Sequence, residues 1–375
     1  MIIDESLYQV ENAEQIESPA LLYYEDIIRA NTVAAIKNAG GARRLWPHVK
    51  SHKMSAMVRM QMDMGITRFK CATIAEAEML AGCGAEDILL AYPLVGPNIM
   101  RFITLAGKYR GSRFWAIGDD LGQISILEKE SAALRITIKL LVDVNLGMNR
   151  TGVPLNSLEE FCRLCSLMGQ GISVQGFHCY DGHNNAPDRS IRDESAKQAY
   201  RNVSAIRTRL EGDGIPLDTI IMGGTPSFPC YCGFPDVYLS PGTIFLSDYG
   251  YASKYPDLKY TPGAVVMSRV ISHPAPGIFT LDAGSKALAA DPAGVRGVIA
   301  GYEDDTEPIS QSEEHWTFRM KENDGSAIPP IGTVLYIIPT HICPTSALYR
   351  AVLTVKEMKV SGAWEVTARN RRLTY

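Results

Sequence analysis

The sequence predicts an α/β protein in which an N-terminal (β/α)8 barrel of the TIM type is followed by a smaller C-terminal β domain. From residue 18 to residue 260, apolar segments of strand length alternate with amphipathic segments of helical period. Eight strands with seven intervening helices in that span match a TIM-type barrel, although a doubly wound open sheet is compatible with the same pattern. After about Gly263, glycine and proline separate short apolar segments with few helical patterns between them, as in an all-β unit.

The barrel is assigned to residues 18–260. It opens with an extended run, Pro19–Glu25, and a helix over residues 26–39 that ends at Gly40-Gly41. Its expected strands are Arg43–Lys50, Thr67–Thr73, Asp87–Tyr92, Ser112–Gly118, Arg135–Val144, Ile172–His178, Leu217–Gly223 and Asp236–Leu239. Helices are expected between most of these strands, among them Ile74–Ala81, Asn98–Lys108, Leu155–Met168 and Asp188–Leu210.

The C-terminal β domain is assigned to residues 261–375, and we expect the N-terminal residues 1–25 to pack on it. Its expected strands are Val265–Ser272, Gly277–Asp282, Val295–Ala300, His315–Arg319, Thr333–Pro339, Tyr349–Val355 and Trp364–Ala368.

The composition is that of a globular protein and argues against several classes of partner. A net charge of −4 and a pI near 6.0 give no basic surface for nucleic acid. No apolar run approaches the ~20 residues needed to cross a bilayer. The acidic N-terminus lacks the features of a signal peptide, so a cytoplasmic location is expected. The eight cysteines are scattered, which favours buried thiols or ligands over a disulfide framework.

The segment Leu45–Lys53 carries the first candidate for chemistry. It delivers Lys50 to the end of an expected strand, with His48 and His52 on either side. A lysine in that position can form a Schiff base if burial lowers its pKa. The alternative is a solvated lysine that caps the following helix.

Three further candidates follow later strands, at the barrel end where TIM-type enzymes place their active sites. Arg150 lies in the segment 145–152 that follows the fifth strand, and residues 178–183, with Tyr180 and His183, follow the sixth. Gly223, Gly224 and Thr225 follow the seventh. Their small side chains and backbone N–H groups predict a phosphate-binding loop, with a plain turn as the alternative.

His341 and Cys343 are candidate metal ligands in the C-terminal domain. In an extended backbone, residues two apart point to the same face, so both side chains could reach one ion. Imidazole and thiolate together suit Zn²⁺, and two ligands would leave open positions, as a catalytic metal requires. A chance His-x-Cys sequence is the alternative.

Seven segments in the same order resemble one known family. They are PHVKSHK at 47–53, CATIAEAEML at 71–80, DILLAYPLV at 87–95, YDGH at 180–183, GGTPS at 223–227, LDAGSKAL at 281–288 and HICPT at 341–345. Together they resemble the D-threonine aldolase and D-serine dehydratase family, which has the alanine racemase fold and uses pyridoxal phosphate. The resemblance runs from about Pro19 to the C-terminus.

The resemblance implies a role for each of these candidate residues. Lys50 would carry the Schiff base to pyridoxal phosphate, and Arg150 would lie near the pyridine ring or its phenolic oxygen. Gly223, Gly224 and Thr225 would hold the cofactor phosphate, with Tyr180 close by. His341 and Cys343 would bind a divalent metal, most suitably Zn²⁺, with Mn²⁺ or Co²⁺ as alternatives. The family works as homodimers.

Two departures from the family pattern concern the lysine and metal motifs. Trp46 stands where the family is expected to have arginine. The metal pair is His-x-Cys, which resembles the dehydratases, whereas aldolases of the family tend to carry His-x-Asp. Dehydration is therefore favoured over aldol cleavage.

The expected function is that of a metal-dependent lyase acting on a D-3-hydroxy amino acid such as D-serine, D-threonine or D-3-hydroxyaspartate. Lys50 is the expected base for the α proton, and His52 or His183 could take a hydroxyl proton or merely orient neighbouring groups. An amino-acid racemase and a non-catalytic pyridoxal phosphate carrier are the alternatives. Arg113, Arg189 and Lys286 are candidate partners for a distal carboxylate, or simply surface charges.

Overall fold

A computed structural model describes residues 3–291, 293–321 and 328–375 of the chain. The chain forms two compact units, each assembled from two stretches of sequence. One unit, here called the barrel unit, comprises Ala35–Gly242 and Asn370–Tyr375. The other, here called the β unit, comprises Met1–Ala34 and Thr243–Arg369.

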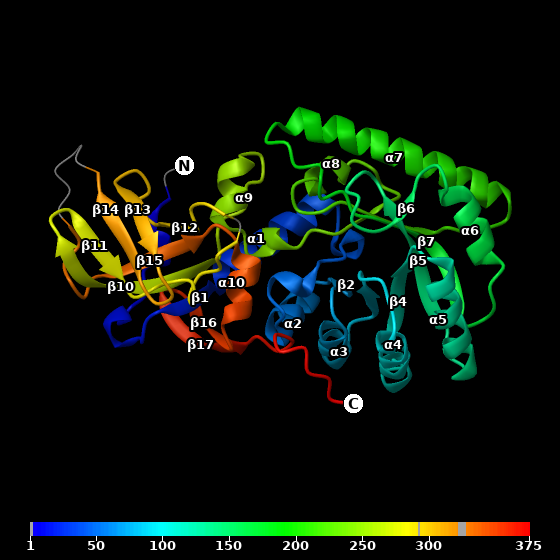
Figure 1. The fold of residues 1–375 in the computed structure, drawn as a ribbon, viewed down its shortest axis with the longest axis horizontal. Helices are drawn as coiled ribbons and strands as arrows, with labels where there is room; N and C mark the ends of the chain where they lie inside the picture. Colours follow the sequence, from blue (N-terminus) through cyan, green and yellow to red (C-terminus); the bar gives the residue numbers. More distant parts are fainter. Residues whose placement is uncertain (1–2, 292, 322–327) are drawn as a thin grey trace. The chain divides into compact units, whose positions relative to one another are not determined.

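Seven parallel strands of the barrel unit pair in the order β2-β3-β4-β5-β7-β8-β9 (Figure 1). Their bounds are β2 (Arg68–Cys71), β3 (Asp87–Leu90), β4 (Arg113–Gly118), β5 (Ile138–Asn145), β7 (Ile172–Cys179), β8 (Thr219–Met222) and β9 (Tyr238–Leu239), with the two-residue β6 (Val153–Pro154) beside β5.

An extended segment at residues 45–48 joins the two ends of this sheet. Leu45 forms a parallel bridge with Leu239 on one side, and His48 forms one with Lys70 on the other. The N–H of Trp46 donates to the carbonyl of Leu239 at 2.8 Å. The segment therefore takes the place of the first barrel strand, and the predicted TIM-type, alanine racemase-like fold is confirmed.

The predicted strand Arg43–Lys50 is wrong at both ends. A 3-10 turn covers Ala42–Arg44, and a second one, Val49–Ser51, contains Lys50. Pro47 supplies no N–H for a ladder, which helps to keep the extended part short. Trp46 points into the barrel core and packs edge-to-face on Trp115, with Leu89, Ile117, Leu141 and Ile221 in the same cluster.

Helices of the barrel unit pack around the outside of this sheet (Figure 1). They are α2 (Ser55–Asp63), α3 (Ile74–Cys83), α4 (Pro97–Lys108), α5 (Leu121–Ala133), α6 (Leu158–Ser166), α7 (Arg189–Gly212) and α8 (Phe228–Tyr231). Side chains of Thr73, Asp120 and Asp188 accept backbone N–H bonds at the starts of α3, α5 and α7. The caps of α3 and α7 lie at the helix starts that the sequence pattern predicts at Ile74 and Asp188.

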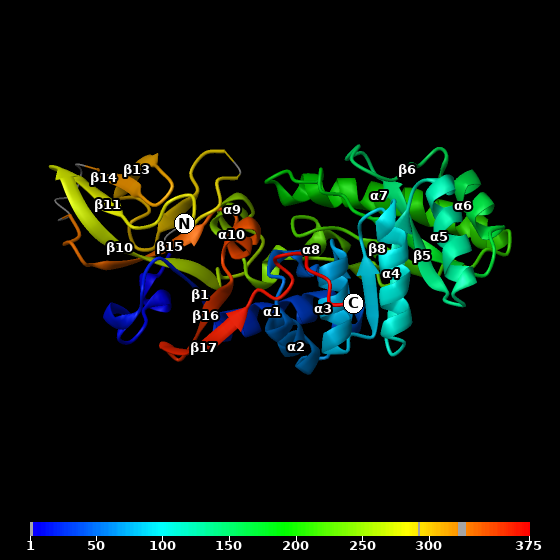
Figure 2. The same ribbon diagram turned by 60° about the horizontal axis from the view of Figure 1, so that its bottom comes forward.

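The β unit is built on a nine-stranded mixed sheet. Its strands are β1 (Ala20–Tyr24), β10 (Ala264–Ala275), β11 (Ile278–Leu281), β12 (Gly297–Ile299), β13 (Thr306–Gln311), β14 (Trp316–Met320), β15 (Val334–Pro339), β16 (Ala351–Lys356) and β17 (Lys359–Glu365). β1 pairs antiparallel with β10 and parallel with β16, and Figures 1 and 2 show it beside β16.

Residues 20–24, which the sequence pattern assigned to the barrel although residues 1–25 were expected to pack on the C-terminal domain, lie in the sheet of the β unit. Leu22 and Tyr24 are buried in one cluster with residues from far along the chain, including Val265, Ile338 and Val355. The continuous apolar run Ala20–Tyr24 would fit a strand of either sheet, so only long-range pairing assigns it.

Three helices of the β unit complete the fold: α1 (Glu25–Ala39), whose last residues belong to the barrel unit, α9 (Tyr249–Lys254) and α10 (Ile342–Leu348). Short 3-10 turns cover Glu5–Tyr8, Ala13–Gln15 and Thr243–Phe245. The strand predicted at Trp364–Ala368 is displaced, since β17 ends at Glu365. Among the residues that the structure describes, no helix has the length and apolar character needed to cross a membrane.

Candidate active site

Lys50 lies just beyond the extended segment that closes the barrel, within the 3-10 turn Val49–Ser51. Its backbone N–H donates to Nδ1 of His48 at 3.3 Å, which fixes that ring nitrogen as an acceptor. Burial lowers the pKa of His48, and the positive charge of Lys50 lowers it further. His48 is therefore a neutral group beside the candidate lysine.

The side chain of a second lysine, Lys70, lies close enough to Lys50 to be affected by its charge. Lys70 was not among the residues predicted for the site. It occupies the third position of β2 and is only 2% exposed. Burial lowers its pKa to about 7, with a further contribution from the positive charge of Lys50. Lys70 could have been predicted from its position near the carboxyl end of β2, the next strand after Lys50.

Lys70, His178 and Asp143 form a buried chain of polar groups from three strands. His178 Nε2 lies 3.5 Å from Lys70 Nζ, and His178 Nδ1 lies 2.7 Å from Asp143 Oδ1. Burial lowers the pKa of His178 despite the carboxylate, so the ring is neutral. Asp143 then accepts a hydrogen bond from Nδ1–H of His178, and Nε2 is left to accept a hydrogen bond from Lys70. The hydrogen bond from His178 keeps the pKa of Asp143 low against the effect of burial.

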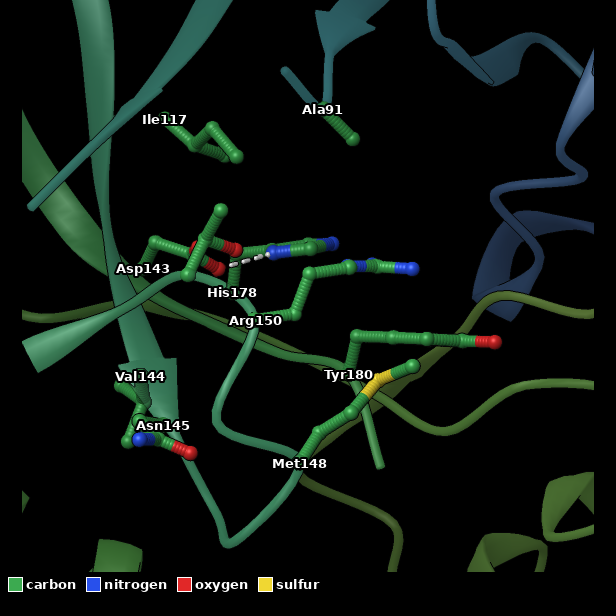
Figure 3. Close-up of a pocket in the computed structure, with 10 residues that line it drawn as sticks. Ala91, Ile117, Asp143, Val144, Asn145, Met148, Arg150, His178 and Tyr180 are labelled. Carbon is green, nitrogen blue, oxygen red and sulfur yellow. Dashed lines mark hydrogen bonds and ion pairs between the residues drawn. The ribbon is translucent and has the colours of Figure 1, made fainter. Parts of the chain in front are cut away.

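A pocket opens above this chain at the carboxyl ends of the strands, where Figure 3 shows His178, Asp143, Arg150 and Tyr180 around one space. The guanidinium of Arg150 lies 4.9 Å from the centre of the Tyr180 ring, and Lys70 Nζ lies 5.6 Å from it. Cations near an aromatic face stabilise its orientation. The structure thus brings together two of the predicted residues, Arg150 and Tyr180.

The loop of Gly223, Gly224 and Thr225 follows β8 and is buried. The N–H of Gly223 donates to the carbonyl of Cys179 at 3.2 Å, and that of Gly224 donates to Ser227 Oγ at 3.1 Å. These two amides are therefore engaged within the protein. A Cβ on Gly224 would lie 2.8 Å from the Tyr180 ring, so glycine allows that ring to approach.

Thr225 connects this loop to the lysine segment. Its Oγ1 accepts from the N–H of Gly242 at 3.3 Å, and Ser51 Oγ donates to the carbonyl of Gly242 at 3.4 Å. Thr225 and Ser51, the residue that follows Lys50, thus contact the same residue, Gly242. A hydroxyl and backbone groups at this place suit a phosphate ligand.

Asp181, which the sequence motifs include only as part of YDGH, holds the residues that follow the Gly223–Thr225 loop. Its buried carboxylate accepts from Ser227 Oγ at 2.6 Å and from the Tyr231 hydroxyl at 2.9 Å. Burial raises its pKa, and these hydrogen bonds lower it in part.

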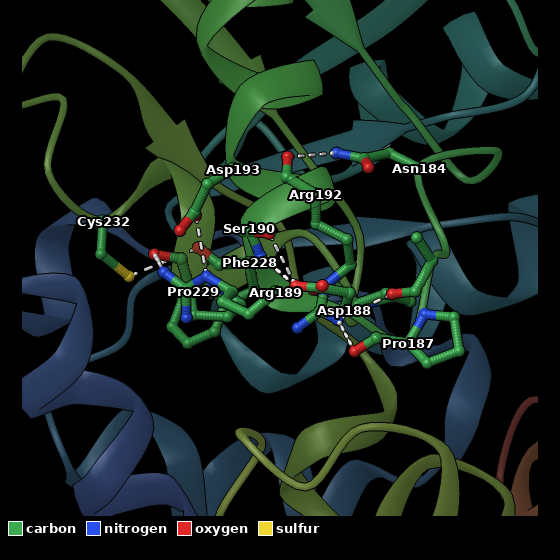
Figure 4. A network of polar contacts seen from close by, with 12 residues as sticks. Asn184, Pro187, Asp188, Arg189, Ser190, Arg192, Asp193, Phe228, Pro229 and Cys232 are labelled. Carbon is green, nitrogen blue, oxygen red and sulfur yellow. Dashed lines mark hydrogen bonds and ion pairs between the residues drawn. The ribbon is translucent and has the colours of Figure 1, made fainter.

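Arg192 on α7 holds the same loop through main-chain contacts, in the polar network of Figure 4. It is completely buried and donates to the carbonyl oxygens of Pro226, Ala186 and Pro187 at 2.8–3.0 Å. A buried arginine that donates to three carbonyls ties together segments that lack secondary structure of their own.

The two candidate histidines differ in environment. His52 is 1% exposed, its Nδ1 accepts from the N–H of Met54 at 3.1 Å, and burial lowers its pKa to about 3. This environment favours the orienting role over proton transfer. His183 is exposed in the loop after β7, and a Cβ on Gly147 would lie 3.2 Å from its Nε2. The loops after β5 and β7 therefore meet at His183.

His341 and Cys343 lie in the β unit, and the expectation of an extended backbone through both is wrong. His341 is extended, but α10 begins at Ile342, so Cys343 lies in its first turn. His341 Nδ1 lies 3.5 Å from Asp291 Oδ2, and Cys343 Sγ lies 3.4 Å from Thr243 Oγ1. Within residues 3–291, 293–321 and 328–375, no group of three or more His, Cys, Asp or Glu residues is arranged to hold a metal ion.

The three candidate partners for a distal carboxylate are engaged elsewhere. Arg113 begins β4, at the opposite end of the strand from the pocket, and pairs with Asp87 at 2.6 Å. Arg189 pairs with Asp193, and Lys286 lies 3.8 Å from Glu313. None of the eight cysteines, all within the described ranges, forms a disulfide.

Comparison with known families explains this arrangement. Residues 25–245 match the family model described as "Alanine racemase, N-terminal domain", and residues 263–355 match the one described as "Putative serine dehydratase domain". The chain belongs to the alanine racemase N-terminal domain family. The resemblance inferred from its motifs is thus confirmed, with the second domain model identifying a particular branch of this family.

Relatives and solved structures from this branch match nearly the full chain. A D-threonine aldolase from Arthrobacter sp. is 26% identical over 95% of this chain and 93% of its own length. A 3-hydroxy-D-aspartate aldolase from Paracoccus denitrificans is 24% identical over the same shares. The crystal structure of D-threonine aldolase from Filomicrobium marinum has a TM-score of 0.87 at 27% identity and covers 96% of this chain and 98% of its own.

Proposed function

We propose that this family member is a pyridoxal phosphate- and divalent-metal-dependent lyase that acts on D-3-hydroxy amino acids. The observation that carries the proposal is that Arg150 stacks on Tyr180 at one end of the barrel, where Gly224 also packs against the Tyr180 ring and Lys50 acts on buried Lys70. The activities of the relatives, D-threonine aldolase, 3-hydroxy-D-aspartate aldolase and D-threo-3-hydroxyaspartate dehydratase, support it because all three are lyases of this substrate class.

The residues of the barrel unit fit pyridoxal phosphate. When bound, the cofactor supplies an electron sink that makes the Cα proton of an amino acid acidic. Lys50 would hold the cofactor covalently and then accept that proton at Nζ. The hydroxyl of Thr225 would bind the phosphate, while Arg150 and Tyr180 line the space beside His178. Asp143 holds neutral His178 in one tautomer beside this space.

His341 and Cys343 would hold the metal, since imidazole and thiolate suit Zn²⁺ and two protein ligands leave positions open for a substrate oxygen. Solved structures of D-threo-3-hydroxyaspartate dehydratase support this pair. They include a histidine-to-alanine mutant and a cysteine-to-alanine mutant in the metal-free form, at positions two residues apart. The same spacing separates His341 and Cys343.

Dehydration is the favoured outcome because this chain carries the His-x-Cys pair. In that reaction the Cβ–O bond breaks, and the products are a 2-oxo acid and ammonia. Aldol cleavage is the second candidate, because two of the matched relatives are aldolases. It breaks the Cα–Cβ bond and gives glycine and an aldehyde. The solved alanine racemases share the fold at 13% identity, which gives racemisation no further support.

Absorption spectroscopy of two lysine variants tests the cofactor assignment. Protein loaded with pyridoxal phosphate should show a visible band that Lys50→Ala abolishes and that Lys70→Met retains. Lys70 is the matched control because it is the other lysine at this end of the barrel. A band that persists in Lys50→Ala and disappears in Lys70→Met would move the covalent attachment to Lys70.

A further inference from the structure

Asp248 is a completely buried carboxylate that accepts hydrogen bonds from two separate segments of the β unit. Its Oδ1 accepts from the N–H of Tyr251 at 2.9 Å, which caps α9. Its Oδ2 accepts from the N–H of Ile342 at 3.1 Å. Burying a carboxylate is costly, and a serine would cap α9 without a charge. The hydrogen bond to Ile342 is therefore what an aspartate provides here and a serine would not.

The N–H that Asp248 binds lies between the two candidate metal ligands. Ile342 is the first residue of α10, His341 is its N-cap, and Cys343 is the second residue of the helix. His341 makes no side-chain cap for α10. Its imidazole instead lies 3.5 Å from Asp291, and Asp248 supplies the cap from a distant part of the chain.

Residues around Asp248 hold the same ligand segment at further points. The N–H of Gly250 donates to the carbonyl of Thr340 at 3.1 Å, and a Cβ on Gly250 would lie 2.4 Å from that oxygen. Thr243 Oγ1 lies 3.4 Å from Cys343 Sγ, where it can donate to a thiolate. Residues 243–250 therefore contact the residue before His341, the residue between the two candidate ligands, and Cys343 itself.

We propose that Asp248 is a positioning residue for a divalent cation, because it fixes the backbone between His341 and Cys343 and so sets how their side chains face one ion. The proposal rests on the metal dependence proposed above. Partners that orient metal ligands typically change metal affinity by about 10–100-fold when they are removed. Asp248 acts on the backbone that carries both ligands, so both should lose their orientation together.

The test is a zinc titration of the full-length, pyridoxal phosphate-loaded protein against a chromophoric chelator. Asp248→Ser keeps a cap for α9 but is too short to reach Ile342, and Asp248→Asn keeps the size but only one acceptor. Asp120→Ser is the matched control, because Asp120 caps α5 in the barrel unit through the N–H of Gln123 at 2.8 Å. We expect zinc affinity to fall about 10–100-fold in both Asp248 variants and to stay unchanged in Asp120→Ser.

Thermal unfolding of the metal-free proteins separates positioning from simple stabilisation. If Asp248→Ser and Asp120→Ser lose similar stability but only the former loses zinc affinity, Asp248 positions the ligands. Zinc affinity of folded Asp248→Ser within about threefold of wild type would overturn the inference. His341→Ala and Cys343→Ala test the underlying metal site separately. Undiminished zinc binding in both would refute that site, and the Asp248 inference with it.

Discussion

His178 joins the carboxylate of Asp143 to the amine of Lys70, with 2.7 Å from its Nδ1 to Asp143 Oδ1 and 3.5 Å from its Nε2 to Lys70 Nζ. The three residues come from β5, β7 and β2, so the chain of contacts crosses the barrel. Because the carboxylate fixes the Nδ1–H tautomer, the imidazole presents a defined acceptor to the lysine. The polarity of the pocket depends on this chain.

Asp143→Ala should lower turnover at least about tenfold, since small displacements of groups lining an active site have large effects on rate. The variant frees the imidazole of His178 to rotate and to change tautomer. Measurement of kcat and KM on D-3-hydroxy amino acids checks the prediction. The exposed Asp63→Asn is the control, and equal kcat values for the two variants would contradict a role for the chain.

Lys70→Met should stabilise the protein at pH 7 by about 2 kcal/mol, because the variant no longer has to keep a lysine neutral in the core. Each unit by which folding lowers the pKa of Lys70 corresponds to about 1.4 kcal/mol, and losing the contact with His178 offsets part of the gain. The pKa of Lys70 is lowered from 10.5 to about 7 on folding. Between these values the unfolded chain binds one more proton than the folded chain, so wild-type stability rises with pH through this window.

Chemical denaturation at pH 7 and at pH 10 measures this effect. The difference between Lys70→Met and wild type should shrink as the pH rises, since the cost of neutralising Lys70 disappears near its unfolded pKa. A difference that is constant from pH 7 to pH 10 would show that Lys70 does not titrate in this range.

Gly224→Ala should weaken the binding of pyridoxal phosphate, because the new Cβ would lie 2.8 Å from the ring of Tyr180 and displace it. The matched control is Gly82→Ala in α3, where a Cβ meets nothing within 4 Å. That control should leave cofactor affinity unchanged and stabilise its helix by about 0.5–1 kcal/mol. Cofactor titration followed by fluorescence gives both affinities, and equal values would disprove the packing argument.

Arg192→Met should destabilise the fold by about 3 kcal/mol, because it leaves the buried carbonyls of Pro226, Ala186 and Pro187 without these donors. Since Pro226 belongs to the loop that contains Thr225, cofactor affinity should fall as well. Urea unfolding with and without pyridoxal phosphate checks both effects. An unchanged midpoint in the apoprotein would contradict the structural role of Arg192.

Sequence periodicity predicts most of the barrel, because parallel strands and amphipathic helices carry strong local patterns. β2, β3, β4 and β8 fall within the predicted segments, and β5 and β7 each end one residue beyond theirs. Local patterns fail where pairing over a long distance decides. Residues 20–24 join the sheet of the β unit through β10 and β16, and residues 45–48 close the barrel with only a bridge on each side.

The candidate site was predictable where a residue follows a strand within a recognisable motif, as Lys50, Arg150 and Tyr180 do. Lys70 and Asp143 escaped because they lie inside strands, where alternation alone does not show which side chains reach the mouth of a barrel. Asp248 escaped for a different reason. Its role depends on a hydrogen bond to Ile342, 94 positions later in the chain.

The homodimer expected from the family resemblance remains a prediction. Light scattering coupled to size-exclusion chromatography should give twice the chain mass of 41.1 kDa. A mass of one chain at micromolar concentration would contradict it.

Product analysis by NMR tests the proposed function most directly. Metal-loaded and pyridoxal phosphate-loaded protein would be mixed with D-serine, D-threonine and both diastereomers of D-3-hydroxyaspartate, beside Lys50→Ala as the control. We predict a 2-oxo acid with ammonia from at least one substrate, and no product from Lys50→Ala. Glycine with an aldehyde would keep the lyase and replace dehydration by aldol cleavage. Inversion at Cα with the substrate otherwise intact would contradict the proposed function.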